Sequence, residues 1–189
     1  MIWFPYEQMK TMKKPWKILD AEGVYLYTEN QKLIDSVSSW WSVIHGYKHP
    51  ELNEAIISQV EKFSHVMLGG LTHEPVEKLS DKLESWLPGD LDYCFFSDSG
   101  SVAVEVGLKM ALQYYMNQGE NQRTKILSLE HSYHGDTFKT MEAGDDEDYH
   151  FVLKAYGPNP HVIHIPTKIP ALEEAFLKYH SELNCFLVE

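Results

Sequence analysis

The sequence is poor in basic residues, and arginine is almost absent from it. Among its 189 residues, 16 are Lys or Arg and 28 are Asp or Glu, so the formal net charge is −12, and Arg123 is the one arginine. Surfaces that bind nucleic acid need clustered Lys and Arg. We therefore expect no nucleic-acid partner, and we interpret the short lysine cluster over residues 10–17 as a solvated arm.

Cysteines, metal-ligand spacings and long apolar runs are also scarce. The two cysteines, Cys94 and Cys185, lie in apolar runs and are interpreted as buried free thiols, and no residue spacing indicates a metal site. No apolar run reaches the length of a membrane span, and residues 1–10 lack the basic start and apolar stretch of a signal peptide. These absences favour a protein without a membrane partner that works in the cytoplasm.

The chain does have enough apolar and aromatic residues for a packed core. Hydrophobic residues make up 43% and aromatic residues 13% of it, which excludes a disordered protein. Alternation over 24–35 predicts a β-hairpin, and an irregular loop with two tryptophans follows over 36–49. Apolar residues at helical spacing then predict one helix after Pro50 and a second helix over 74–86.

From residue 91 onwards, strand patterns and helix patterns alternate. Strands are predicted over 91–96, 123–129, 161–165 and 185–189, and helices over 100–116, 136–141 and 171–180. This order implies right-handed βαβ crossovers and a parallel sheet with helices on both faces. We therefore expect an N-terminal arm with hairpin and Trp loop (1–49), a helical connection (50–90) and an α/β domain (91–189).

The turn Ser99-Gly100-Ser101 joins the first predicted strand of this domain to its helix, at the edge where parallel sheets bind ligands. A helix N-terminus there offers backbone N–H groups and a partial positive charge. Neither serine is followed three residues later by Glu or Gln, so no capping box competes for the donors. Gly100 allows a ligand close to the backbone. The turn fits a phosphate, although on the turn alone an ordinary serine N-cap is the more common explanation.

The segment HSYHGDTF, residues 131–138, follows the next strand and should open onto the same edge of the sheet. Tyr133 is able to stack on a flat ligand ring and to present its hydroxyl to a substrate. Asp136 is a candidate to orient a neighbour or to cap the short helix. His134 beside Gly135 is more often a turn histidine than a catalyst. By itself this motif is a weak signal. One predicted crossover separates it from the serine turn, and this position adds weight to it as part of the same site.

Aromatic residues cluster in two irregular segments near the N-terminus. SSWWSVIHGYKHP, residues 38–50, sets Trp40 next to Trp41. Adjacent tryptophans in irregular structure do not easily both fit a core, so one of them is a candidate to line an apolar pocket. A loop pinned to the core by its indoles explains the pattern equally well. WFPY, residues 3–6, fits an arm that clamps onto a partner subunit.

These segments together resemble one family. WFPY, SSWWSVIHGYKHP, SHVMLGGLTHEPV, FFSDSGSVAVEVGLKMALQYY and YHGDTF occur in this order, and the chain resembles class III aminotransferases over nearly its whole length. The Trp-Trp loop and the GGLTH segment resemble more narrowly the branch that aminates 8-amino-7-oxononanoate to 7,8-diaminononanoate in biotin biosynthesis. The resemblance implies an α/β, fold-type I transferase that uses pyridoxal 5′-phosphate (PLP) and forms a homodimer. S-adenosylmethionine is the expected amino donor, and lysine is the alternative.

The resemblance also implies how this chain would hold the cofactor. Gly100 and Ser101 would grip the phosphate of PLP, and Ser99 would support them. Tyr133 would stack on the pyridine ring and would also touch the substrate.

Further residues are implied in substrate binding. Trp40 would line the substrate pocket, and Tyr6 would reach the keto substrate from the N-terminal arm. Asp136 would lie beside this set in a supporting role. Lys139 stands where relatives often carry a small residue, so we do not expect it to be catalytic.

The sequence departs from the family in one respect. None of its lysines sits in a motif that matches the Schiff-base lysine, and we expect that lysine and the aspartate that pairs with the pyridine nitrogen to lie beyond Glu189. We therefore expect an N-terminal piece, made of the arm, part of the small domain and the first half of the large parallel-sheet domain. It would contain no catalytic residue and would be inactive alone.

Two alternatives stay open beside this reading. The first is another class III aminotransferase with a different amino or keto substrate, against which the Trp40-Trp41 loop argues. The second is a non-catalytic fragment whose only property is association or dimerisation, suggested by a last strand without a covering helix.

Overall fold

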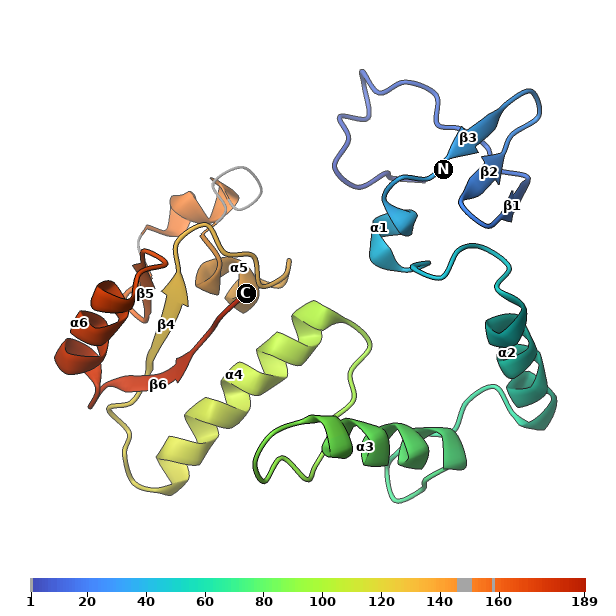
Figure 1. Ribbon diagram of the computed structural model, residues 1–189. Helices are drawn as coiled ribbons and strands as arrows, with labels where there is room; N and C mark the ends of the chain where they lie inside the picture. The colour runs from blue at the N-terminus through green and yellow to red at the C-terminus, as the bar shows by residue number, and fades with distance from the viewer. Residues whose placement is uncertain (1, 146–150, 158) are drawn as a thin grey trace. The chain divides into compact units, whose positions relative to one another are not determined.

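The computed structural model describes residues 2–145, 151–157 and 159–189 (Figure 1). The chain divides into two compact units, Met1–Lys82 and Leu83–Glu189. Within the described ranges, none of the helices combines the length and the apolar character needed to cross a bilayer. The same residues contain no group of three His, Cys, Asp or Glu side chains arranged to hold a metal ion.

The first unit opens with a small antiparallel sheet. Its strands are β1 (Asp20–Glu22), β2 (Tyr25–Tyr27) and β3 (Lys32–Ile34), in the order β1-β2-β3. The hairpin predicted over 24–35 is confirmed as β2 and β3, and β1 is an additional strand that the pattern did not indicate.

The Trp loop contains a short turn of unusual handedness. The four residues of α1 (Ser38–Trp41) all have positive φ, between +47° and +66°. Left-handed backbone costs non-glycine residues about 1–2 kcal/mol each, so other contacts must hold this turn in place. The rest of the loop is irregular as predicted, and Tyr47 near its end forms an isolated bridge with Gly23, which lies between β1 and β2.

Two helices follow where the apolar spacing predicted them. α2 (Pro50–Lys62) begins with a proline in its first turn, where the missing N–H has no intrahelical partner to lose. α3 (Glu74–Trp86) has the bounds that its pattern predicted.

The second unit is built on a parallel sheet of three strands. These are β4 (Lys125–Leu129), β5 (Val162–Ile165) and β6 (Leu183–Phe186), in the order β5-β4-β6, and β4 pairs in parallel with both neighbours. The parallel sheet and the alternation of strand and helix are confirmed. The last strand begins and ends earlier than the predicted 185–189.

Four helical segments accompany this sheet: α4 (Gly100–Asn117), α5 (Phe138–Ala143), the 3₁₀ helix η1 (Phe151–Tyr156) and α6 (Ile169–Tyr179). α6 contacts β5, whereas α4 contacts β6 and α5 (Figure 1). Because side chains alternate along a strand, Leu127 faces the α6 side and Ile126 faces the α4 side. Helices therefore cover both faces of the sheet, as expected for a parallel sheet.

The strand predicted over 91–96 is wrong. In the described structure this segment belongs to no helix or sheet, and Tyr93 is 96% exposed. A strand requires hydrogen bonds to a neighbouring strand, and its apolar pattern alone cannot provide that neighbour.

The two thiols also differ from the expectation of full burial, because Cys94 and Cys185 are free but only partly buried. Burial still raises the pKa of the Cys185 thiol to about 11.

The core of the second unit depends on Leu127, which packs with Ile165, Ala175 and Leu183 and is 0% exposed. We expect Leu127→Ala to lower the free energy of opening of this sheet by about 2–5 kcal/mol, because it leaves a cavity. Hydrogen exchange of the β4 amides measures this loss. The control, Leu177→Ala on α6, removes a side chain that is 80% exposed and should change the value by less than about 0.5 kcal/mol. Equal losses in the two variants would contradict the assigned core.

Candidate functional site

The start of α4 is capped by Ser99. Its backbone is extended (φ −154°, ψ 161°), and its hydroxyl accepts a hydrogen bond of 3.2 Å from the Val102 N–H. The common serine N-cap is therefore present. This cap serves the third amide of the helix and leaves the amides of Gly100 and Ser101 outside it. Gly100 is exposed, and nothing lies within 4 Å of the position that a Cβ would take there.

The loop 131–137 lies directly on this helix start. The Asp136 N–H donates to the Ser101 hydroxyl oxygen at 3.0 Å, and the Tyr133 hydroxyl donates to the Asp136 carboxylate at 2.8 Å. The structure thus brings together three of the predicted site residues, Ser101, Tyr133 and Asp136. Tyr133 stays 43% exposed, so part of its ring remains open for contact with a ligand.

Gly135 makes this approach possible, and the sequence reasoning gave it no role. It is buried with φ +123°, and a Cβ on it would lie 2.3 Å from the Ser101 Oγ. Both values exclude a side chain. A glycine between the histidine and the aspartate of the YHGDTF segment was the available signal.

Buried hydroxyl groups connect the loop 131–137 to β4. The Ser128 Oγ lies 3.1 Å from the Ser132 Oγ and 3.0 Å from the His134 Nε2, and the Ser132 hydroxyl donates to the Leu129 carbonyl at 2.7 Å. Burial lowers the pKa of His134 below its ordinary value. The lowered pKa favours the neutral ring. His134 therefore helps to hold the loop through its contact with Ser128.

Glu189 also contacts the loop, since its carboxylate accepts a hydrogen bond of 2.6 Å from the Tyr133 N–H. Together, the exposed helix start, the Ser101 hydroxyl and the exposed tyrosine ring make up a candidate site, whose chemistry would suit a ligand with an anionic group next to a flat ring. The dipole of α4 and the two amides outside the cap supply the partial positive charge.

Two predicted substrate-lining residues meet in the first unit. The rings of Tyr6 and Trp40 stand edge to face with centroids 5.5 Å apart, and both side chains are more than 60% exposed. Asp35 holds the turn that carries Trp40: its carboxylate accepts hydrogen bonds from the Tyr47 hydroxyl at 2.7 Å and from the Ser39 N–H at 2.8 Å. The Tyr47 hydrogen bond, aided by backbone donors, lowers the pKa of Asp35.

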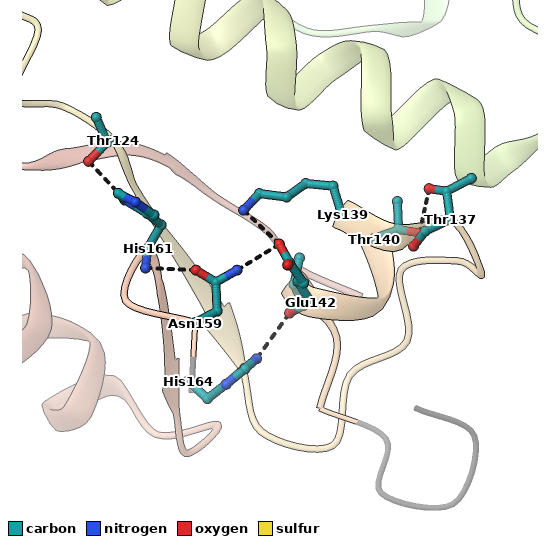
Figure 2. Close-up of polar contacts among 9 residues, drawn as sticks. Thr124, Thr137, Lys139, Thr140, Glu142, Asn159, His161 and His164 are labelled. Atoms are coloured by element: carbon teal, nitrogen blue, oxygen red, sulfur yellow. Dashed lines mark hydrogen bonds and ion pairs between the residues drawn. The ribbon is translucent and has the colours of Figure 1, made fainter. Parts of the chain in front are cut away.

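Lys139 belongs to a separate polar network, shown in Figure 2. Its ammonium lies 2.9 Å from the Glu142 carboxylate, which also accepts a hydrogen bond of 2.6 Å from Asn159. The Asn159 side chain in turn accepts from the His161 N–H at 2.9 Å. This network ties α5 to the entry of β5, and it gives Lys139 a structural partner.

Solved structures with this architecture define the class of protein. The chain aligns with the crystal structure of adenosylmethionine-8-amino-7-oxononanoate aminotransferase from Methanocaldococcus jannaschii with a TM-score of 0.85 and 36% identity, over 98% of this chain and 44% of that one. It aligns with an omega transaminase from Pseudomonas jessenii, solved with PMP, with a TM-score of 0.88 over 100% of this chain and 47% of that one. At 21% identity the second match concerns the fold alone. The fold is that of the fold-type I PLP-dependent transferases.

The sequence comparison narrows this class to a family. The pattern described as aminotransferase class-III matches residues 7–185, and the chain belongs to that family. A curated relative from Buchnera aphidicola subsp. Schizaphis graminum, named adenosylmethionine-8-amino-7-oxononanoate aminotransferase, is 44% identical over 185 residues, which is 97% of this chain and 40% of the relative. The chain therefore spans less than half the length of the relatives that it matches.

The contacts of Asp35 lead to a prediction about pH. Because its pKa is lowered, the Asp35 carboxylate stays charged at neutral pH and stabilises the turn Ser38–Trp41, here called the Trp turn. This stabilisation is lost only as the pH falls through the lowered pKa, which lies below the ordinary 3.8. We expect the indole NMR signal of Trp40 to stay constant from pH 8 to pH 5 and to shift under stronger acid. Asp35→Asn should shift it already at pH 7, whereas the control Asp81→Asn on the exposed side of α3 should not. An unchanged signal in Asp35→Asn would contradict the assigned network.

Proposed function

We propose that this chain supplies the phosphate seat, the ring-stacking residue and a substrate-lining segment of a PLP-dependent aminotransferase. Its reaction converts 8-amino-7-oxononanoate to 7,8-diaminononanoate in biotin biosynthesis, with S-adenosylmethionine as the amino donor. The single observation that carries the proposal is the contact of the Tyr133-bearing loop with the exposed start of α4 through Ser101. The names of relatives at 36% and 44% identity support the choice of substrate.

The residues at the start of α4 fit the cofactor's phosphate. The amides of Gly100 and Ser101 would donate to its oxygens, and Ser99 would keep the helix start in place through its cap. The Ser101 oxygen already accepts from Asp136, which leaves its own proton to donate to an anion. PLP, when bound, withdraws electrons from the carbon that carries the amino group, so that a proton can leave that carbon.

Tyr133 fits the other half of the cofactor. Its partly exposed ring would cover the pyridine face, and its hydroxyl bond to Asp136 would fix the ring's orientation. Trp40 and Tyr6, in edge-to-face contact, would line the pocket for the aliphatic chain of the substrate.

The remaining parts of the proposal concern the assembly. We expect the complete enzyme to be a homodimer in the cytoplasm. The chain spans less than half the length of its relatives, and we expect this part of the enzyme to bind PLP.

The phosphate seat can be tested by binding. We expect Ser101→Ala to weaken PLP binding to the 189-residue chain about ten-fold, because hydrogen bonds to charged groups contribute about 1.5–3 kcal/mol. Titration of the chain with PLP, followed by protein fluorescence, gives the Kd. The matched control, Ser58→Ala, changes an exposed serine of α2 and should leave the Kd unaltered. If Ser101→Ala binds PLP as the parent chain does, Ser101 does not hold the phosphate.

The substrate assignment can be tested at Trp40. Addition of 8-amino-7-oxononanoate to the PLP-loaded chain should shift the Trp40 indole NMR signal, and Trp40→Ala should weaken binding of this compound several-fold by calorimetry. Pyruvate, a small keto acid, is the control ligand and should cause no shift. Equal responses to both compounds would favour a different class III substrate, and the absence of any response would reject Trp40 as a lining residue.

A further inference from the structure

A Cβ placed on Gly135 would come closer to its neighbours than a Cβ on Gly46, whose nearest neighbour would lie 3.0 Å away. The Cβ on Gly135 would lie 2.3 Å from the Ser101 Oγ, 2.7 Å from the Ser101 Cβ and 2.8 Å from the Ser101 Cα. Two of these three atoms belong to the short side chain of a helical serine and the third to its backbone, so no flexible group is present that could move aside. The positive φ of +123° is a second and independent reason for glycine.

The close approach determines what the Ser101 hydroxyl can do. A serine hydroxyl has one proton and two lone pairs. At 3.0 Å, the Asp136 N–H occupies one lone pair, and the hydroxyl proton must then point away from that donor. The Ser101 oxygen therefore has a defined orientation before any ligand arrives.

The loop cannot retreat from Ser101 at low cost. Its underside is tied to β4 through the buried Ser128 and Ser132 hydroxyls and through His134. Moving the loop outward would break these buried hydrogen bonds, and unsatisfied buried polar groups are costly. A side chain at position 135 would therefore displace Ser101 rather than the loop.

We propose that Gly135 is a positioning residue for the phosphate seat: its missing side chain lets the Asp136 N–H hold the Ser101 hydroxyl in the orientation that donates to the cofactor phosphate. This inference rests on the proposed function. Gly135 touches neither cofactor nor substrate in it, and acts only through Ser101.

The test is a double-mutant cycle on the 189-residue chain, with PLP and inorganic phosphate as separate probes. Gly135→Ala should raise the Kd for both probes about ten-fold, close to the effect of Ser101→Ala. In the Ser101→Ala background, Gly135→Ala should raise the Kd by a clearly smaller factor than in the parent chain, because the hydroxyl is gone and only the contacts with the Cβ and Cα of residue 101 remain. A merely structural role would add its full effect in both backgrounds.

Gly119 provides the matched control. It also has a positive φ, +79°, but nothing lies within 4 Å of its Cβ position. Gly119→Ala should therefore carry the backbone strain without the contact, and should lower the melting temperature without changing either Kd. An equal loss of affinity in Gly119→Ala would overturn the inference.

Hydrogen exchange gives a readout without cofactor. The Asp136 amide should exchange at least ten-fold faster in Ser101→Ala than in the parent chain, whereas the Gly144 amide, bonded to the Thr140 carbonyl, should not change. This measurement decides the matter even if Gly135→Ala fails to fold. Unchanged exchange at Asp136 would overturn the inference.

The outcomes separate this inference from the proposed function. PLP binding that is indifferent to Gly135→Ala, or an equal loss in both backgrounds, overturns the inference and keeps the function. Phosphate binding that depends on Gly135, without PLP binding, rejects the function and keeps the inference. A chain that binds neither probe rejects both.

Discussion

The close contact between the loop 131–137 and the first turn of α4 is the constraint on which the candidate site depends. It exists because one Cβ is missing: the Gly135 backbone rests on Ser101, and the next amide reaches the serine oxygen. The same aspartate that supplies this amide accepts the hydroxyl of Tyr133. The start of α4 and the segment that carries Tyr133 are therefore held together by the contact of the loop backbone with the Ser101 side chain.

The proposed phosphate seat would rely on dipoles, in a chain of net charge −12. Its donors would be backbone amides and a hydroxyl, aided by the N-terminal end of the α4 dipole, and Ser99 caps the helix without occupying the first two amides. Such donors are already oriented before a ligand binds, so little reorganisation is needed. Burial below the loop favours a neutral His134, which keeps its hydrogen bond with Ser128 a contact between uncharged groups.

The Trp turn in the first unit is also held by hydrogen bonds in a backbone conformation that is costly by itself. Four consecutive non-glycine residues with positive φ are costly. The Asp35 carboxylate offsets part of this cost by accepting hydrogen bonds from the Tyr47 hydroxyl, from the Ser39 amide inside the turn and from the Val37 amide just before it. The strained conformation presents Trp40 edge to face with Tyr6. Strain of this kind persists only where surrounding contacts enforce it, and it is often found at binding segments.

Short-range pattern by itself determined the type and approximate bounds of most elements: the hairpin, α2, α3, α4 and the alternation around the parallel sheet. The family followed from the resemblance of several motifs to known proteins. The family resemblance placed Ser101, Tyr133 and Asp136 in one candidate site, whereas the argument from a shared strand edge relied on the strand over 91–96, which the structure does not contain. Tertiary structure alone decided that residues 91–96 form no strand, since pairing needs a neighbour that periodicity cannot provide. It alone showed that Gly135 lies against Ser101, because the glycine is visible in the YHGDTF segment but its distant partner is not.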